Sequence, residues 1–209
     1  MTKVGVLAAQ GAFIEHINVL KALGIDAIEV RLPCQLKGLA GLIIPGGEST
    51  TIGKIMMRFD LLEPVRRLAI AGLPVYGTCA GMILLAKDIG PYDQPHLGIL
   101  DVRVRRNAFG SQVDSFETDL RIPVLGERPF RGIFIRAPLV ESVSPAVEVL
   151  ATLPEGGIVA VRQRNLLATA FHPELNDDPR FHQYFLEMIE ESNDSTDTTN
   201  RLSRAGVLQ

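Results

Sequence analysis

The first half of the chain alternates short apolar runs with longer segments in which apolar residues recur at helical spacing. Four of the runs are too short for helices and are typical of buried strands: 3–8, 26–30, 39–44 and 73–76. The helical spacing predicts helices over 13–23, 52–59 and 61–71, and Gly24 follows the first of them as a C-terminal cap would. Strands that alternate with helices in this way predict a parallel, doubly wound sheet.

The pattern changes after residue 90, where prolines interrupt it. It predicts short strands at 102–105 and 119–122, followed by closely spaced and partly antiparallel strands at 131–137, 147–153, 158–163 and 166–171. A closing helix is expected over 180–191. Residues 192–209 are rich in Ser, Thr, Asn and Asp without an apolar period, so we expect a disordered or loosely attached tail. The sequence therefore predicts one domain over 1–191, without internal repeats, followed by this tail.

Composition narrows the class of protein. A chain of 209 residues with 46% hydrophobic content can bury one α/β core. A net charge of −3 and a pI near 5.8 argue against a nucleic-acid surface. The chain has two cysteines, too few for a disulfide framework, and no apolar stretch of the ~18 residues that a membrane helix needs. Because a strand pattern follows Met1 almost directly, we expect no signal peptide, no membrane partner and a cytoplasmic location.

A cysteine stands where the predicted strand 73–76 meets a helix expected over 82–86. The segment Gly77-Thr78-Cys79-Ala80-Gly81 is a cysteine version of the Gly-x-Ser-x-Gly nucleophile elbow, a sharp turn that exposes its central residue. Glycines are expected on both sides because side chains there would clash in the strained turn. The N–H groups and dipole of a helix N-terminus stabilise a thiolate, which makes Cys79 a candidate nucleophile. The alternative is a buried cysteine in a glycine-rich turn.

A catalytic cysteine needs a base, and His172 is the best placed histidine. It follows the predicted strand 166–171 in the sequence Phe171-His172-Pro173-Glu174. In extended backbone, His172 and Glu174 project to the same side, so that Glu174 could hold the imidazole as the carboxylate does in Ser-His-Asp sites. The alternative is an ordinary turn. We expect His16 and His182 to be surface or packing residues, and His96 to lie in a loop without a partner.

The turn Pro45-Gly46-Gly47-Glu48-Ser49 follows the predicted strand 39–44. Its backbone N–H groups could stabilise an oxyanion together with the N–H of Ala80, the residue after the candidate nucleophile. The alternative is an ordinary strand-to-helix turn in which Ser49 or Thr50 caps the helix. The sequence has no Cys/His cluster with the spacing of a zinc site, so we expect no metal.

The elbow, the Pro-Gly-Gly turn and the His-Pro-Glu segment together resemble the class I, triad-type glutamine amidotransferases. Within that group, six blocks resemble the glutaminase subunits of pyridoxal 5′-phosphate synthases: LAAQGAF at 7–13, PGGESTT at 45–51, RNAFG at 106–110, VDSFE at 113–117, FIRAP at 134–138 and AFHPE at 170–174. The resemblance covers residues 1 to about 190 and leaves out the tail. Ala9 stands where many relatives carry Leu, and Ser111 where many carry Arg.

This resemblance implies a three-layer, flavodoxin-like α/β domain whose mostly parallel sheet has an antiparallel portion in the C-terminal half. It implies hydrolysis of L-glutamine through a glutamyl thioester, without a cofactor. The ammonia would pass to a (β/α)8-barrel synthase subunit in a hetero-oligomer that makes pyridoxal 5′-phosphate. The residue roles that it implies are Cys79 as nucleophile, His172 and Glu174 as relay, Gly47 and Ala80 as oxyanion donors, and Gly47, Glu48, Ser49, Arg106, Ile135 and Arg136 as glutamine-binding residues.

Other interpretations remain open at this point. Arg106 could be a solvated charge next to Arg103 and Arg105, and Arg136 could end a strand without contacting a ligand. A cysteine peptidase or stress protein could use the same scaffold and elbow, although the Gly-Gly turn and Arg136 favour an amino-acid amide as substrate. The chain could also be a catalytically silent binding subunit that only shapes its partner.

Overall fold

The structure is a computed structural model that describes the backbone of residues 2–108 and 115–204 and the side chains of 2–108 and 115–194. Its α-helices are α1 Phe13–Ala22, α2 Ser49–Arg58, α3 Leu62–Ile70, α4 Ala80–Leu85 and α5 Arg180–Arg204. Short 3-10 turns are η1 Pro33–Leu36, η2 Pro123–Leu125 and η3 Pro173–Leu175. The strands are β1 Lys3–Leu7, β2 Asp26–Val30, β3 Gly41–Ile44, β4 Val75–Thr78, β5 Ala86–Asp88, β6 Leu100–Arg105, β7 Ser115–Leu120, β8 Phe130–Ile135, β9 Leu139–Val143, β10 Glu148–Thr152, β11 Ile158–Gln163 and β12 Leu166–Thr169.

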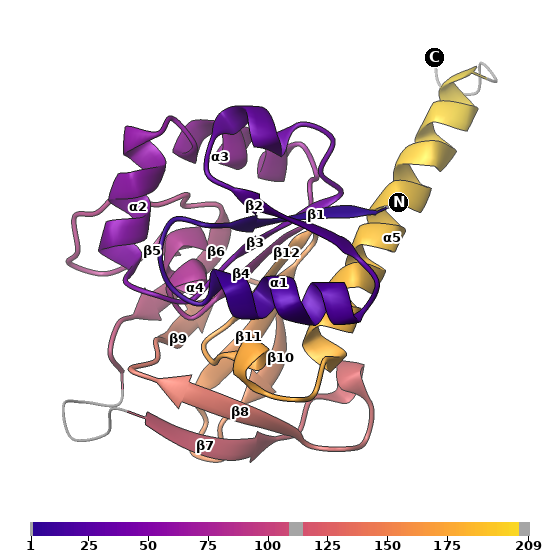
Figure 1. Cartoon of the computed structure of the whole chain (residues 1–209). Coiled ribbons are helices and arrows are strands. Elements are labelled where there is room, and N and C mark those ends of the chain that lie inside the picture. The colour runs from indigo at the N-terminus through magenta and orange to yellow at the C-terminus, as the bar shows by residue number, and fades with distance from the viewer. Residues whose placement is uncertain (1, 109–114, 205–209) are drawn as a thin grey trace.

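One large mixed sheet organises the described part of the chain (Figure 1). Its strand order is β2-β1-β3-β4-β12-β11-β9-β6-β5, and β10 pairs with β11 beside this path. The strands from β2 to β12 run parallel, whereas β11 pairs antiparallel with β12, β9 and β10. A separate antiparallel hairpin consists of β7 and β8. The fold is therefore α/β, with a mostly parallel sheet and an antiparallel part formed by the second half of the chain, as the sequence predicts.

The helices cover both faces of the parallel part because successive side chains of a strand point to opposite faces. On β4, the Tyr76 ring lies 5.6 Å from the Phe185 ring of α5 and 6.4 Å from the His16 ring of α1, measured between centroids. The next residue, Gly77, faces α4 on the other side, where an added Cβ would lie 2.7 Å from Leu85 Cδ1. Helices α1 and α5 thus share one face, and α4 covers the opposite face.

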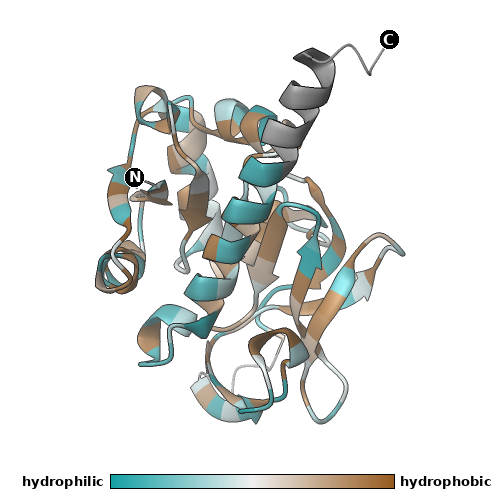
Figure 2. Cartoon of the chain, turned by 90° about the vertical axis from the view of Figure 1, so that its right-hand side faces the viewer, coloured by the Kyte–Doolittle hydropathy of each residue, from teal (hydrophilic) through white to brown (hydrophobic). Residues whose placement is uncertain are grey.

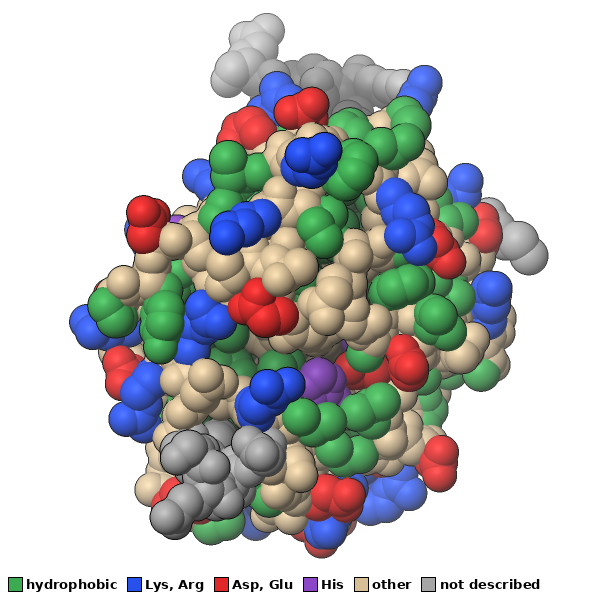
Figure 3. All heavy atoms as spheres, turned by 60° about the vertical axis from the view of Figure 1, so that its left-hand side comes forward, with side chains coloured by type: hydrophobic (Ala, Val, Ile, Leu, Met, Phe, Trp, Pro, Cys, Tyr) green, Lys and Arg blue, Asp and Glu red, His purple; other side chains and the backbone are tan. Residues whose placement is uncertain are grey.

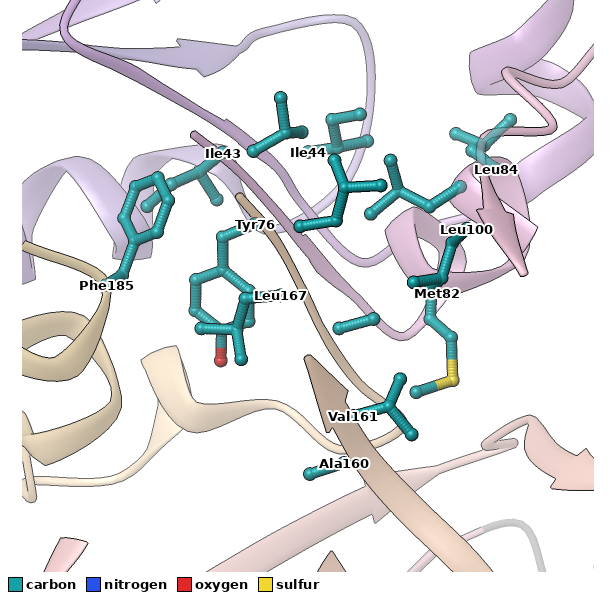
Figure 4. Close-up of a cluster of buried hydrophobic side chains, with 14 of the residues drawn as sticks. Ile43, Ile44, Tyr76, Met82, Leu84, Leu100, Ala160, Val161, Leu167 and Phe185 are labelled. Carbon is teal, nitrogen blue, oxygen red and sulfur yellow. The ribbon is translucent and has the colours of Figure 1, made fainter. Parts of the chain in front are cut away.

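Aliphatic and aromatic side chains fill the space between sheet and helices. Figure 4 shows Tyr76 and Phe185 on one side of the β3 and β4 strands, with Met82, Leu84 and Leu100 farther along the same core. All five are buried. Burying a Leu, Met or Phe side chain of this kind contributes about 1.5–3 kcal/mol. In Figure 2, α5 presents a largely hydrophilic outer side, which is the pattern of a helix packed along one face only.

The structure corrects several expected element boundaries, among them the start of α2, which is Ser49 and not residue 52. Helix α4 ends at Leu85, and Ala86 already belongs to β5, which pairs with β6. Strand β7 begins at Ser115, ahead of the expected 119. The closing helix does not end at Glu191 but continues to Arg204, so the expected helix end is wrong, whereas the loose attachment of residues 192–209 stays a prediction. Residues 205–209 of that tail lie outside the described part.

Strand β9 is not predicted by the sequence pattern, although it connects β6 to β11 inside the sheet. Its side chains explain the omission, because only Val140 of the strand is fully buried while Glu141 and Ser142 are exposed.

In the segments that the structure describes, no helix has the length and apolar character needed to cross a bilayer.

Candidate active site

The parallel pairing of β1, β3, β4 and β12 places the ends of these strands along one edge of the sheet. Thr78 at the end of β4 is in register with Thr169 at the end of β12. The Gly46-Gly47 turn follows β3 and the Cys79 elbow follows β4, whereas His172 follows β12 by a few residues. Pairing of neighbouring strands therefore brings together segments that are far apart in the sequence.

Cys79 occupies the strained turn that the sequence predicts. Its backbone has φ 48° and ψ −99°, a conformation that non-glycine residues rarely adopt, and its N–H donates to the Thr169 carbonyl at 2.7 Å. A Cβ on Gly77 would lie 2.6 Å from backbone atoms of Gly81, and a Cβ on Gly81 would collide with the Ile44 carbonyl. Both flanking glycines are thus required by close backbone packing. The Cys79 side chain is buried and lines the pocket described below. The other cysteine, Cys34, is exposed and does not line that pocket.

His172 and Glu174 form the predicted pair, but not on the extended backbone that the sequence suggested, because Glu174 lies in the 3-10 turn η3 that begins directly after His172. His172 Nδ1 lies 2.7 Å from Glu174 Oε1, and both side chains are buried. The backbone N–H of His172 donates to the Ile133 carbonyl of β8 at 2.8 Å, which fixes the segment between the large sheet and the hairpin. Gly46 packs directly against the imidazole, because an added Cβ would overlap the ring carbon Cε1.

The charges around His172 favour its protonated form. Burial by itself would lower the pKa of His172, but hydrogen bonds to Cys79 and Glu174, together with the charges of these groups, raise it to about 10. Burial opposes ionisation of Glu174, yet the neighbouring His16 and His172 rings hold the pKa of Glu174 below its usual value. The arrangement places the Cys79 sulfur and the His172 imidazole together, with the Glu174 carboxylate behind the ring.

A pocket of about 290 Å³ lies over Cys79 and His172. Its other lining residues are Gln10, Gly47, Glu48, Ser49, Ile83, Arg106, Asn107, Ile135 and Arg136. The volume is close to the lower end of the ~300–1,000 Å³ of small-molecule sites. Figure 3 shows a histidine side chain near the middle of one face, among acidic, basic and hydrophobic side chains.

Glu48 and Arg106 form a polar wall of this pocket. Glu48 caps α2, because its carboxylate accepts the N–H groups of Thr50 and Thr51 at 3.0 and 2.8 Å. Partial burial alone would raise the pKa of Glu48, but hydrogen bonds from these two threonines lower it to about 2. The Arg106 guanidinium donates to Glu48 Oε1 at 3.1 Å and to Gln94 Oε1 at 2.7 Å. The helix cap is therefore Glu48, and the alternative in which Ser49 or Thr50 caps the helix is wrong.

Arg106 is not a solvated member of a charge run, since its side chain is 17% exposed and paired with Glu48. Arg103 and Arg105 pair with Glu141 instead. Of the residues predicted for the site, Cys79, His172, Gly47, Glu48, Ser49, Arg106, Ile135 and Arg136 line the pocket. Ala80 follows Cys79 as the first residue of α4 and is buried, and Glu174 lies behind His172.

Sequence reasoning missed Gln94, which is buried and accepts hydrogen bonds from Thr50, Ser49 and Arg106. It lies in an irregular, proline-rich segment where no periodicity marks a buried side chain. Ser111, one of the two noted departures from the resembled family, lies outside the described residues. Ala9, the other, is partly buried against the core.

Of the two expected placements for His16 and His182, surface or packing, the structure shows the second. Both are fully buried, and His16 Nε2 lies 3.4 Å from Glu174 Oε2. The sequence pattern gives no sign that His16 lies beside the carboxylate behind the base or that His182 contacts His16. His96 does lie in a loop, where its ring contacts the Gln94 carbonyl at 3.0 Å. Among the described residues, no three His, Cys, Asp or Glu side chains are arranged to hold a metal ion.

Comparisons with known proteins give a consistent result. Residues 6–191 match the model of the SNO glutamine amidotransferase family. The chain is 66% identical over 187 residues to the pyridoxal 5′-phosphate synthase subunit PdxT of Moorella thermoacetica, covering 90% of this chain and 99% of that protein. It is 62% identical over 186 residues to the subunit of the same name from Herpetosiphon aurantiacus, covering 88% and 98%.

Two solved structures have a similar fold. One described as a glutamine amidotransferase is 52% identical, with a TM-score of 0.85 over 90% of this chain and 98% of that one. The PurLQS structure from Thermotoga maritima is 16% identical, with a TM-score of 0.64 over 89% and 98%, and at that identity it shows similarity of fold alone.

Proposed function

The chain belongs to the SNO glutamine amidotransferase family, and from this premise we propose that it is the glutaminase subunit of pyridoxal 5′-phosphate synthase. It hydrolyses glutamine and supplies ammonia for vitamin B6 biosynthesis. The observation that carries the catalytic assignment is the convergence of Cys79, His172 and Glu174, with sulfur and imidazole in one pocket and the carboxylate 2.7 Å from the imidazole. We assign these residues the roles of nucleophile, acid–base and orienting carboxylate.

The proposed chemistry follows from that arrangement. The Cys79 thiolate attacks the carboxamide carbon of glutamine, and the backbone N–H groups of Gly47 and Ala80 stabilise the tetrahedral oxyanion. His172, protonated while it faces the thiolate, gives its proton to the leaving nitrogen, so that ammonia departs and a γ-glutamyl thioester remains. His172 then takes a proton from water, and the hydroxide formed releases glutamate and returns the thiolate.

The remaining pocket residues suit an amino acid. A glutamine α-carboxylate pairs well with a guanidinium, and Arg106 and Arg136 both line the pocket. Glu48 carries a negative charge at neutral pH, as its pKa of about 2 requires, and suits an α-ammonium group. Gly47, Ser49 and Ile135 complete the wall around the side-chain amide.

We further propose that the partner is a synthase subunit with a (β/α)8-barrel fold, whose binding activates the glutaminase. The Gly46 carbonyl accepts from Ala12 N–H at 3.2 Å, which orients the peptide between Gly46 and Gly47. Glycine allows this peptide to rotate at small steric cost, so a partner that contacts the Gln10-Gly11 segment could select the orientation that aims Gly47 N–H at the oxyanion. Loss of the Gly47 N–H donor would reduce the rate of glutamine hydrolysis by roughly 10²–10³-fold.

We also propose that the protein is located in the cytoplasm.

The decisive experiment measures ammonia and glutamate release from free glutamine by the full chain, with and without saturating synthase subunit. Cys79→Ala and Cys79→Ser should abolish turnover while circular dichroism and melting temperature stay near wild type, and Cys34→Ser should be fully active. Activity that persists in Cys79→Ala would contradict the assigned nucleophile. If the free chain already runs at the saturated rate, activation by the partner is contradicted without affecting the triad.

The same preparation tests the rival assignments. Cleavage of peptides without glutamine turnover would indicate a cysteine peptidase. A wild-type chain that neither turns over glutamine nor labels at Cys79 with a glutamine-like electrophile would indicate a silent binding subunit.

A further inference from the structure

Two histidines outside the proposed triad are buried directly behind it. His16 on α1 lies between three groups, with Nδ1 2.9 Å from His182 Nε2 of α5, and Nε2 3.2 Å from Thr78 Oγ1 and 3.4 Å from Glu174 Oε2. Thr78 precedes the candidate nucleophile, and Glu174 holds the candidate base. His16 therefore contacts both halves of the site from the rear, although it does not line the pocket.

The unpaired oxygen of Glu174 favours one proton arrangement in this cluster. Glu174 Oε1 is occupied by His172, whereas Oε2 is buried and has no well-formed hydrogen bond to any described residue. A buried carboxylate oxygen without a donor is unfavourable, and His16 Nε2 is placed to supply one. If Nε2 carries the proton in a neutral ring, then Nδ1 is an acceptor and must receive the Nε2 proton of His182.

The surroundings favour neutral rings at both positions. Tyr76 presents its ring at steep angles to His16 and His182, and Phe181 and Phe185 pack against Tyr76. Burial lowers the pKa of His16, partly opposed by the charge of Glu174, and burial with the nearby His16 lowers the pKa of His182. The other titratable groups that face the pair are His172, Glu15 and Tyr76. His182 Nδ1 has no described partner, as expected for a ring that keeps its proton on Nε2.

We propose that His16 is a positioning residue for catalysis: as a neutral donor supported by His182, it holds Glu174 Oε2 so that Oε1 stays on His172 Nδ1. The relay would then extend from His182 through His16 and Glu174 to His172. Without His16, the carboxylate could rotate or take up a proton, and His172 would lose its fixed orientation toward Cys79. This role rests on the proposed function, because it acts through the triad.

Substitutions that remove or retain the donor test the proposal in the full chain with saturating synthase subunit. His16→Leu removes it and should lower kcat ~10- to ~100-fold with KM within about twofold, as expected for loss of one buried hydrogen bond to a charged group. His16→Gln can place an amide N–H near the position of ring Nε2 and should recover kcat to within about threefold of wild type. Equal kcat values for His16→Leu and His16→Gln would overturn the proposal.

Val65→Ala is the matched control, because it truncates a buried side chain of α3 outside this cluster. It should lower the melting temperature and leave kcat unchanged, which separates loss of catalysis from loss of stability. If His16→Leu does not fold, ¹⁵N NMR of the wild-type histidine rings still decides the matter. A neutral His16 with its proton on Nε2 from pH 6 to 8 supports the proposal, and a charged ring or a proton on Nδ1 refutes it. Wild-type protein without glutaminase activity would refute the proposed function, whereas the NMR result would still report the tautomer.

Discussion

Replacing Gly46 by alanine would test how closely the position of His172 limits catalysis. The backbone of Gly46 lies outside the left-handed region, so alanine introduces no strain in φ. The added Cβ, however, would overlap His172 Cε1 and lie 2.9 Å from Nδ1, whereas ordinary contacts begin at 3.4 Å. The imidazole must therefore move by about 1 Å, and a misplacement of that size can reduce the rate ~10²-fold.

The assay is kcat for glutamine hydrolysis at saturating glutamine and synthase subunit, together with the melting temperature. Gly41→Ala is the matched control, because its Cβ would lie 2.5 Å from Ile189 Cδ1 and 3.0 Å from Phe185 Cζ, in the core beneath α5. That variant should lose stability and keep kcat. A Gly46→Ala enzyme with kcat within about threefold of wild type would show that the ring tolerates displacement, and the reasoning would be wrong.

Three further predictions use the same preparations. Glu174→Gln should reduce kcat less than His172→Ala, since Glu174 orients the base without moving the proton itself, and full activity of Glu174→Gln would remove it from the site. Deleting residues 192–209 should leave activity and melting temperature nearly unchanged, and a drop of more than a few degrees would show that this segment packs on the domain or on a partner. The pKa values of His16 and His182 are lowered in the folded protein, so below pH 6.5 the unfolded chain binds more protons than the folded one. As the pH is lowered from 6.5, the free energy of unfolding should therefore decrease by about 1.4 kcal/mol per pH unit for each histidine, until the pH reaches the pKa of that histidine in the folded protein. Urea titrations at several pH values, with His182→Phe expected to show the smaller slope, measure this effect, and equal slopes would contradict it.

Periodicity predicts the parallel half of the fold well, because its inner strands β1, β3, β4 and β12 are almost entirely buried and consist mostly of apolar residues. It predicts the antiparallel half less well. Strand β9 carries Glu141 and Ser142 on an exposed side and lacks the apolar signal, although it lies inside the sheet. The sequence pattern ends α5 too early, because a polar composition without apolar period does not by itself exclude helix.

The local motifs predict the pocket residues because each motif fixes a backbone geometry. The two glycines around Cys79 permit the strained turn, and the spacing in His172-Pro173-Glu174 allows the two side chains to meet. Contacts between distant segments carry no such local signal. Gln94 comes from an irregular segment, and His16 reaches Glu174 only because α1 packs beside η3.

The order in which the sheet is assembled has a consequence for synthesis of the protein. Strand β12, which lies between β4 and β11, comes after all the other strands that the structure describes. While the ribosome is still making that region, β4 has an unpaired edge, and Cys79 lacks both the Thr169 carbonyl that holds its N–H and the histidine that faces it. A prematurely terminated chain that lacks β12 would therefore be inactive and would expose a hydrophobic strand edge, which favours aggregation. The core and the reactive centre are completed only when this strand and the His172, Glu174 and α5 residues that follow it are in place.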